Sequence, residues 1–494
     1  MNVKHSLSMN RLSFILPALL LSLVSVSGQT YETRLERHSW KDSRNINWIR
    51  SIEDSFSCAE LTGGYTFGDY HDPFDADFRW NAGAKASGTS YLDRFSFIGD
   101  FSFENTQMYG ATGSMSAVPG YYPVDIYEFT PGNKTRQVYS LTGGISIDLS
   151  KEWLLGGSFS YEAQNYTKRK DLRHTTYHMA IEVSPAILWH RGDRRLGLSY
   201  TYSRNTQSIS AEELGVSSGV YYAFLDEGLF YGTRDIWDNT STHLKETGLD
   251  RFPVQENGHT LALQFQKGRL YGELAAGLNS GKTGEKQKIW YNYGTSLLDG
   301  RLAYTITRDR FLDIFSLHGS VSVQRNRENI LEDITENGIT TTLNYGSTQI
   351  LARGRSGLSL GWEKIGIQEE TRMGAQISYG RQEAVASVVY PETGTALVQS
   401  VGLRLHGRIP LAGRLLAGGA IGLEKGFWED SEGAVTRCEE YYEAMREWKT
   451  DLKVPAEAFV RYSFPRGIYV RYDVRFVGHR NGQLANMLSL GYNF

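Results

Sequence analysis

Residues 467–478 read GIYVRYDVRFVG, and the direction in which the two faces of this stretch point decides the fold. Side chains of an extended chain alternate between two faces. Here one face is apolar and the other carries Arg471, Asp473 and Arg475. In a soluble sandwich the apolar face packs in a core, whereas in a transmembrane barrel it contacts lipid and the charges face a wet lumen. The stretch fits both folds, so the evidence that distinguishes a soluble sandwich from a transmembrane barrel has to come from the rest of the chain.

The composition of the 494-residue chain favours strands and excludes some partners. Aromatic residues make up 13%, and 52 Gly stand against 11 Pro, a balance that favours many strands joined by tight turns. The formal net charge is -3, without the basic excess of nucleic-acid-binding proteins, so no nucleic-acid partner is expected. The 2 cysteines are too few for a disulfide scaffold.

The first 28 residues have the pattern of a secretory signal peptide. The basic residue Arg11 precedes a short apolar run over residues 12–24, and small residues lead to an exit at Gly28. Pro17 interrupts the run, which disfavours a membrane helix. No later run approaches the roughly 18 apolar residues that a membrane helix needs. We therefore expect an exported chain that carries no spanning helix.

Alternating segments recur from about residue 57 to the end, as in Leu196–Tyr202 and Val401–Ile409. They match the period of a strand rather than that of a helix. We count about 18 strands (16–18), joined by tight polar turns that alternate with longer connectors, as expected for an outer-membrane barrel. The expected strands lie near 57–69, 76–88, 92–108, 136–149, 153–166, 173–189, 195–208, 258–266, 270–280, 286–306, 311–327, 340–364, 371–390, 396–410, 414–428, 453–464, 467–478 and 481–494.

The end of the chain, NMLSLGYNF, favours the barrel over the sandwich. Leu488, Leu490, Tyr492 and Phe494 share one face, and the last residue is aromatic. This pattern resembles the C-terminal strand of bacterial outer-membrane barrels, where it serves as an assembly signal. The resemblance implies recognition by the barrel-assembly machinery and contact with outer-membrane lipid. The apolar face also carries aromatic residues near strand ends, as in the girdles of such barrels: Trp153, Tyr202, Trp428, Tyr462, Phe464 and Tyr492.

Three further stretches resemble an uncharacterised family of signal-bearing Gram-negative outer-membrane barrels. They are ELTGGYTFGDY (60–70), RFSFIGDFSFENTQMYG (94–110) and KRKDLRHTTYHMAIEVSPAILW (168–189). The resemblance implies the outer membrane and a single all-β domain, and it implies no activity. We expect a signal peptide at 1–28, a short periplasmic segment at 29–56 and, at 57–494, an antiparallel transmembrane barrel with short periplasmic turns, long extracellular loops and both termini periplasmic.

The residues opposite the apolar rows are the candidate lumen lining: Arg404, His406, Arg408, Arg471, Asp473 and Arg475. A lumen of mixed charge predicts a porin-like channel for small polar solutes. The alternative is a non-conducting barrel that serves as a binding or assembly partner in an outer-membrane uptake or secretion complex. A hydrolase at the barrel rim is the third hypothesis. We expect no enzyme activity, no cofactor and no bound metal.

Several motifs have a structural interpretation beside a functional one. GLSLG (357–361) matches a serine nucleophile pattern, but its alternation predicts a strand. GLNSGKTG (277–284) lacks the spacing of a phosphate loop and is interpreted as an external hairpin. HDPFDAD (71–77) could hold a divalent cation, but a solvated loop is the simpler interpretation. The basic tip at 166–174 could dock anionic head groups or be a solvated turn.

Two segments outside the strands are open to several interpretations. Residues 29–56 could form a periplasmic tail, a partial lumen insert or a partner-binding segment. Residues 429–452 resemble a helix, and with the connector 209–257 they could cap the pore or form a docking surface. Cys58 is expected at the periplasmic side and Cys438 in an outer loop, too far apart for a disulfide.

Overall fold

The computed structural model describes residues 35–38, 40–52, 55–212, 221–237, 252–285, 288–367, 369–387, 393–431, 438–478 and 482–494. The predicted signal peptide at 1–28 lies outside these ranges. Within them, no helix is long and apolar enough to cross a membrane.

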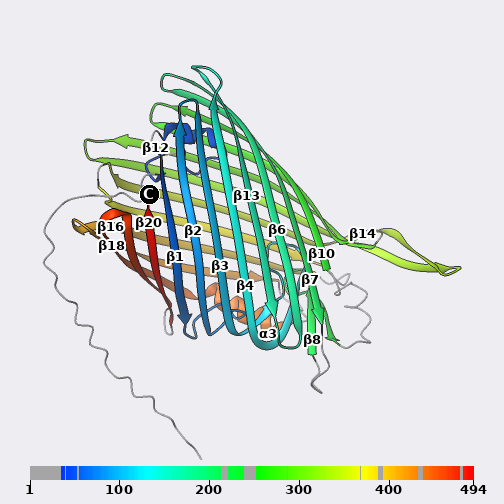
Figure 1. The fold of residues 1–494 in the computed structure, drawn as a ribbon. Helices are drawn as coiled ribbons and strands as arrows, with labels where there is room; N and C mark the ends of the chain where they lie inside the picture. Colours follow the sequence, from blue (N-terminus) through cyan, green and yellow to red (C-terminus); the bar gives the residue numbers. More distant parts are fainter. Residues whose placement is uncertain are drawn as a thin grey trace, which may run out of the picture.

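In the described part of the chain, eighteen antiparallel strands close into one barrel (Figure 1). Consecutive strands pair, except that β7 pairs with β10, and β20 closes the ring by pairing with β1. Closure leaves no open sheet edge, which lipid would not tolerate. The strands are β1 (Phe56–Phe67), β2 (Phe78–Leu92), β3 (Phe95–Ser114), β4 (Asp125–Asp148), β5 (Trp153–Lys168), β6 (Arg173–Arg191), β7 (Arg194–Glu212), β10 (Phe252–Lys267), β11 (Leu270–Glu285), β12 (Lys288–Thr307), β13 (Phe311–Glu336), β14 (Ile339–Gly366), β15 (Arg372–Ala386), β16 (Gly394–Ala412), β17 (Leu415–Asp430), β18 (Leu452–Ser463), β19 (Ile468–Gly478) and β20 (Gly482–Asn493).

The two faces of the barrel wall differ as the alternation predicts. On β16, Leu403 and Leu405 are 43% and 47% exposed on the outer surface, while Arg404 points to the other side. On β19, Tyr472 is 47% exposed outward, whereas its neighbour Asp473 is buried. An apolar outside and a polar inside are the architecture of outer-membrane barrels. The predicted fold class and strand number are confirmed.

The two ends of the barrel differ in their connections. At one end, here the turn end, short turns join the strands, and Gly192 and Gly268 supply the left-handed φ values of 63° and 56° that such turns require. The other end, here the loop end, carries the long connectors. The connector predicted at 209–257 contains an unpredicted hairpin, β8 (Tyr221–Asp226) and β9 (Gly232–Trp237), and β8 pairs with β4.

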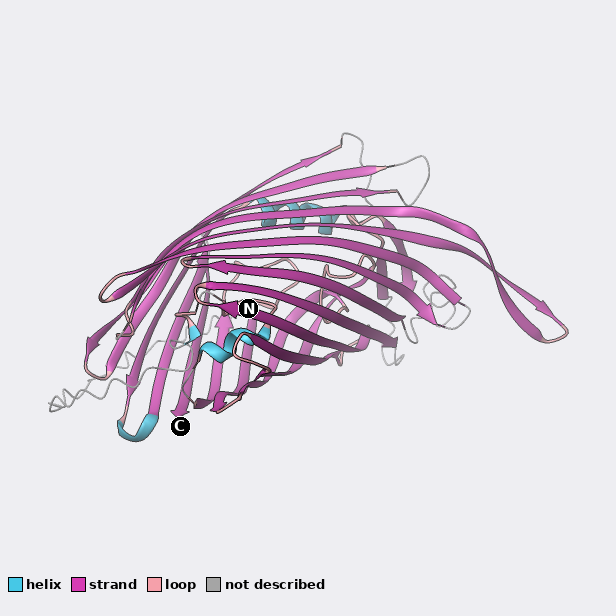
Figure 2. Cartoon of the chain, turned by 90° about the horizontal axis from the view of Figure 1, so that it is seen from above, coloured by secondary structure: helices cyan, strands magenta, loops and turns pink. Residues whose placement is uncertain are grey.

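Two further elements stand at the loop end. The helix predicted within 429–452 is present as α3 (Glu439–Thr450). Strands β13 and β14 extend past the other strands as a protruding hairpin (Figure 2). Short 3-10 turns lie at η1 (Ile46–Ser51) and η2 (Pro465–Gly467).

Candidate functional site

Residues 35–38 and 40–52, here together the insert, lie in the lumen against the wall at the turn end. The Asn45 amide donates to the Ile187 carbonyl at 2.9 Å, and the Asn47 amide donates to the Ala186 carbonyl at 3.3 Å. The wall makes room with glycine, because a Cβ at Gly156 would lie 2.6 Å from the Asn47 side chain. Trp48 is 5% exposed and packs in an apolar cluster against the wall. The segment is therefore a lumen insert, one of the three interpretations that the sequence left open.

Ion pairs fix this insert to opposite parts of the wall. Arg44 Nη1 lies 2.9 Å from Asp299 Oδ1 and 3.3 Å from Glu273 Oε1. Burial alone lowers the pKa of Arg44, but hydrogen bonds and charge attraction from these two carboxylates outweigh it, so the pKa is raised. Arg50 donates to Asp148 Oδ1 at 2.9 Å. Farther along the wall, the Glu36 carboxylate forms ion pairs with Arg372 of β15 and Arg408 of β16.

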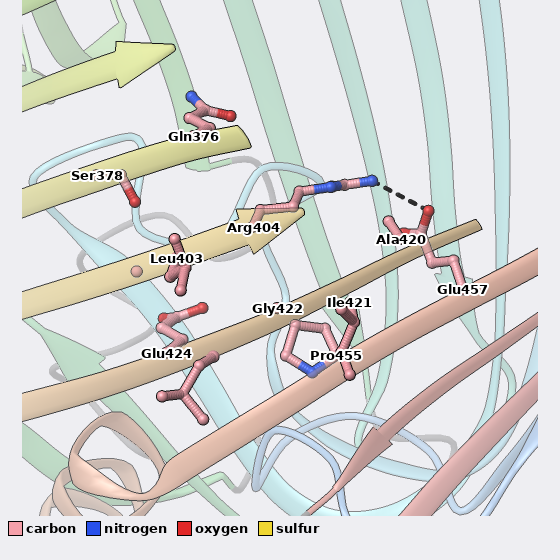
Figure 3. A pocket seen from close by; sticks show the side chains of 12 residues that line it. Gln376, Ser378, Leu403, Arg404, Ala420, Ile421, Gly422, Glu424, Pro455 and Glu457 are labelled. Atoms are coloured by element: carbon pink, nitrogen blue, oxygen red, sulfur yellow. Dashed lines mark hydrogen bonds and ion pairs between the residues drawn. The ribbon is translucent and has the colours of Figure 1, made fainter. Parts of the chain in front are cut away.

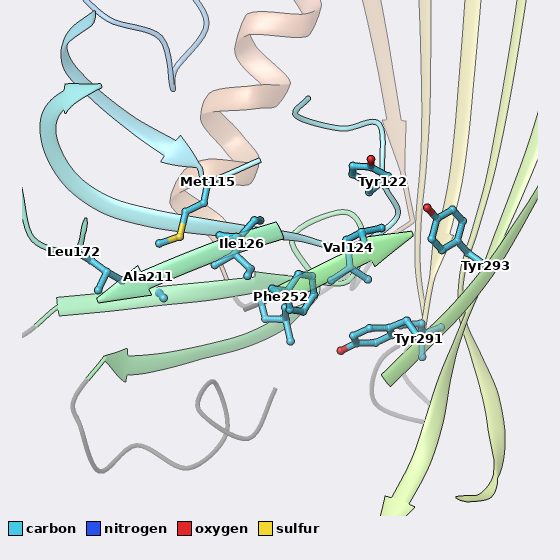
Figure 4. Packing of buried hydrophobic residues seen from close by; sticks show 14 residues of the cluster. Met115, Tyr122, Val124, Ile126, Leu172, Ala211, Phe252, Tyr291 and Tyr293 are labelled. Carbon is cyan, nitrogen blue, oxygen red and sulfur yellow. The ribbon is translucent and has the colours of Figure 1, made fainter. Parts of the chain in front are cut away.

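Inward-folded loops close the loop end. The segment 115–124 between β3 and β4 turns into the lumen, where the Ser116 hydroxyl and the Ala117 amide both donate to Gln207 Oε1. Met115, Ile126 and Phe252 belong to one cluster of buried apolar residues there (Figure 4). A second cluster joins the β8–β9 turn to α3 through Phe230 and Tyr442.

Cavities lie between these closures in the described part of the chain, and two of them share a wall. The loop-end cavity, of about 940 Å³, lies below the loop 115–124 and reaches β14–β17. The wall cavity, of about 210 Å³, lies against β15–β18 (Figure 3), and Glu424 lines both cavities. The inward positions of this wall carry small side chains, which leave space in the lumen: Ser378, Gly380, Ser400, Gly402, Ala420 and Gly422.

The predicted lining residues of β16 lie beside these cavities. Arg404 lines the wall cavity, and its Nη2 lies 3.1 Å from Glu457 Oε2 (Figure 3). His406 Nε2 lies 3.8 Å from Glu363 Oε1, and Arg408 pairs with Glu36 of the insert. The structure therefore places all three on the inner side of the wall, where each faces a carboxylate.

The predicted lining residues of β19 also share one face. Arg471 Nη2 lies 2.7 Å from Asp473 Oδ1, and its guanidinium stacks 4.3 Å above the Phe459 ring. Arg475 is exposed and stands opposite Glu457 in the strand register. The four residues of the predicted assembly signal lie on the outer surface, 38–71% exposed: Leu488, Leu490, Tyr492 and Phe494.

One predicted girdle residue is wrong. Trp428 does not face outward, because Phe427 takes the outward position of β17 and is 52% exposed. The Trp428 ring lies instead inside the loop end, 5.5 Å from the ring of Tyr442 on α3. The girdle residues Trp153, Phe464 and Tyr492 are exposed as predicted.

The motifs weighed in the sequence lie in ordinary strands and loops. Ser359 lies within β14, and 277–284, predicted as an external hairpin, belongs to β11. No group of three or more potential metal ligands occurs among the described residues, which include 71–77. Cys58 lies on β1 at the turn end and Cys438 at the loop end, as expected.

Besides His406 with Glu363, a closer acid–histidine pair lies in the lumen. His318 Nε2 lies 2.6 Å from Asp299 Oδ2. The same carboxylate binds Arg44 of the insert, so the pair belongs to the anchorage of the insert. Sequence reasoning missed this anchorage, and the available signal was the two tryptophans, Trp40 and Trp48, in an otherwise polar segment.

Comparisons with solved structures give distant matches to outer-membrane barrels. The ferric preacinetobactin receptor BauA from Acinetobacter baumannii is 10% identical, with 90% of this chain and 80% of that chain covered and a TM-score of 0.40. The ferric-catecholate import receptor Fiu from E. coli K12 is 8% identical, with 89% and 82% covered and a TM-score of 0.43. OccAB4 from Acinetobacter baumannii is 11% identical, with 89% and 98% covered and a TM-score of 0.33.

A search of curated proteins gives no match. A model of a family of unknown function, DUF6850, matches residues 48–426, which is most of the barrel. The expectation of an uncharacterised family is thereby confirmed. The chain belongs to the family DUF6850.

Proposed function

We propose that the protein is an outer-membrane transport barrel, with both termini periplasmic, in which small polar solutes pass along the wall formed by β15–β18. The observation that carries this proposal is the pair of cavities that meet at Glu424 along this wall. Most contacts of the insert are with the wall from β3 to β12, away from both cavities. The terminal face around Phe494 serves as the signal for the assembly machinery.

The charges along the route suit polar solutes. Arg404 and Glu457 offer a donor and an acceptor beside the wall cavity, and both side chains are about half exposed. Farther toward the turn end, the pair of Glu36 with Arg408 joins the insert to the same wall. Solutes that leave the wall cavity would pass this ion pair, so its opening and closing would control passage along the route.

Narrowing the route tests the proposal. We expect the purified barrel in planar bilayers to conduct, and Ala420→Trp to reduce the conductance several-fold because the new ring fills the wall cavity. The matched control is Leu405→Trp, whose side chain lies on the outer surface, 47% exposed, and does not line the wall cavity. Equal conductance of both variants, or a barrel that stays closed even without residues 30–52, would refute solute passage.

The second candidate is a non-conducting barrel that binds a partner or ligand at the loop end. It is favoured by one observation, the closure of the loop end by apolar clusters and by α3. Gentle solubilisation and co-purification discriminate between the two, because a stable companion together with zero conductance supports binding, and conductance without a companion supports passage.

A further inference from the structure

Three arginines of the loop-end cavity have no carboxylate partner among the described residues. Arg136, Arg353 and Arg355 line the cavity, and no carboxylate oxygen of those residues lies within 4.0 Å of their guanidinium nitrogens. Arg136 and Arg353 are half-buried, and Arg355 is exposed. Three like charges thus face one cavity without an ion-pair partner, which leaves them available to an anion.

Their hydrogen bonds are all to neutral acceptors. Arg353 donates to the carbonyls of Gly120 and Tyr121, each at 3.0 Å, and to the amide of Gln324. Arg355 donates to the Gly120 carbonyl at 2.8 Å. A guanidinium has five N–H donors, so each of these groups keeps donors and its full charge for another acceptor.

Arg136 belongs to the same arrangement on the opposite side. Its Nε and Nη2 donate to a single oxygen, Gln164 Oε1, at 3.0 and 2.8 Å. This contact fixes the direction of the guanidinium without neutralising it. Rigid, planar guanidinium groups are the side chains best suited to carboxylate and phosphate oxygens.

The acidic residues around the cavity are mostly occupied by donors of their own loops. Asp75 pairs with Arg79 at 2.8 Å, and Asp226 accepts from two backbone amides of the β8–β9 turn. Burial also raises the pKa of Asp226 to about 6, which reduces its mean charge. Asp125 accepts from the Ser114 hydroxyl at 2.7 Å. Asp72 and Glu424 line the cavity as well, and Asp226 attracts Arg353 at longer range, but none of these acids forms an ion pair with the three arginines among the described residues.

A further polar group in the cavity lacks a partner. Tyr122 is 4% exposed and lines the cavity, and its hydroxyl has no hydrogen-bond partner within the described ranges. A buried hydroxyl without a partner is rare and costly. Together with the arginines it supplies a donor set for an acceptor-rich molecule. The volume of about 940 Å³ suits a small molecule rather than a folded protein.

We propose that the loop-end cavity binds a small polyanionic solute that carries carboxylate or phosphate groups, held by Arg136, Arg353 and Arg355. This inference rests on the proposed function, because it names the class of solute that would pass. It can be tested as binding, without any measurement of conductance.

The experiment is calorimetric titration of the full-length barrel in detergent with citrate, with tripolyphosphate and with sucrose as a neutral probe. We expect at least one anion to bind and sucrose not to bind. Binding of citrate alone assigns carboxylates, and binding of tripolyphosphate alone assigns phosphates. Binding of neither anion, or equal binding of sucrose, would overturn the inference, whereas a binding barrel that does not conduct would overturn only the proposed function.

Substitutions locate the site. Arg353→Gln with Arg355→Gln should weaken anion binding about tenfold or more, because two charge-assisted contacts are lost. Since both arginines also hold the loop 115–124, Arg136→Gln is the second variant, as its guanidinium donates to Gln164 of β5 and not to the carbonyls of Gly120 and Tyr121. The control is Arg325→Gln, on an exposed position of β13. Anion affinity that is unchanged in Arg136→Gln and in the double variant would contradict the site.

Discussion

Among the described residues, the insert lies in the lumen at the turn end, and its links to the wall include ion pairs such as Arg44 with Asp299 and Arg50 with Asp148. At the loop end the closing segment 115–124 is continuous with two barrel strands and packs in a dry apolar cluster around Met115. The insert is thus followed by one barrel strand, β1, whereas the segment 115–124 joins two barrel strands, β3 and β4.

This difference sets how reversible each closure is. Charged groups that leave the wall regain hydration, so a released ion pair loses much less free energy than the bare attraction suggests. A buried apolar cluster has no such compensation, because its side chains would meet water. The insert also packs in an apolar cluster around Trp48, so its release costs free energy as well. We infer that the insert is the more easily removed of the two closures, because ion pairs supply part of its attachment.

Removing the insert should have the largest effect. A variant without residues 30–52 keeps the predicted signal peptide and loses every ion pair between the insert and the wall. We expect its single-channel conductance to rise severalfold above that of the full chain, because barrels of 16–18 strands leave an aqueous channel. Planar bilayer recording measures the change.

The control replaces residues 30–52 with a Gly/Ser linker of the same length, which preserves the chain length but removes the side chains that contact the wall. This variant should conduct like the deletion. A deletion variant whose conductance equals that of the full chain would show that the turn end is not the main closure.

Weakening the apolar cluster should have a smaller and different effect. Ile126 is fully buried, so Ile126→Ala should destabilise the loop end by about 2–5 kcal/mol. Limited proteolysis of the loop 115–124 and thermal unfolding measure this loss. The matched control is Ile330→Ala on the protruding hairpin, where the side chain is 54% exposed and little change is expected. A protease-resistant Ile126→Ala variant would remove the contrast between the two ends.

The barrel wall could be predicted from the sequence because its signal is local. Each strand repeats the alternation of two residues, so the inward position of Arg404 and the outward position of Leu403 follow from their neighbours alone. The expected even strand number is confirmed, and it follows from closure by an antiparallel pair, β20 with β1.

The contents of the lumen could not be predicted, because they depend on contacts between distant residues. Arg44 and Asp299 are 255 positions apart, and no periodicity links them. The inward loop 115–124 depends in the same way on Gln207. The error on Trp428 is of another kind, because the alternation of β17 with Phe427 outward already places Trp428 inward, where Tyr442 of α3 packs against it. The candidate lining residues were found through alternation, whereas the unpaired Arg353 and Arg355 required the structure.

A pH dependence of the loop end is the smallest predicted effect. Glu227 is 4% exposed in the β8–β9 turn and accepts a hydrogen bond from the Tyr291 hydroxyl at 2.7 Å. Burial raises its pKa from 4.5 to about 7, so the docked hairpin binds a proton that the released hairpin gives up. The docked state is therefore most stable below pH 4.5 and loses stability as the pH rises to about 7, by at most about 3 kcal/mol.

Proteolysis of the β8–β9 hairpin at pH 5 and pH 8 measures this dependence, and the hairpin should be cut faster at pH 8. Glu227→Gln keeps the shape and removes the charge, so it should abolish most of the difference above pH 6. Burial raises the pKa of Asp226 to about 6, so Asp226 should account for the pH dependence of cleavage that remains below pH 6. Faster cleavage at the acidic pH would mean that Glu227 is charged in the docked hairpin and that ionic contacts hold the loop end as they do the turn end.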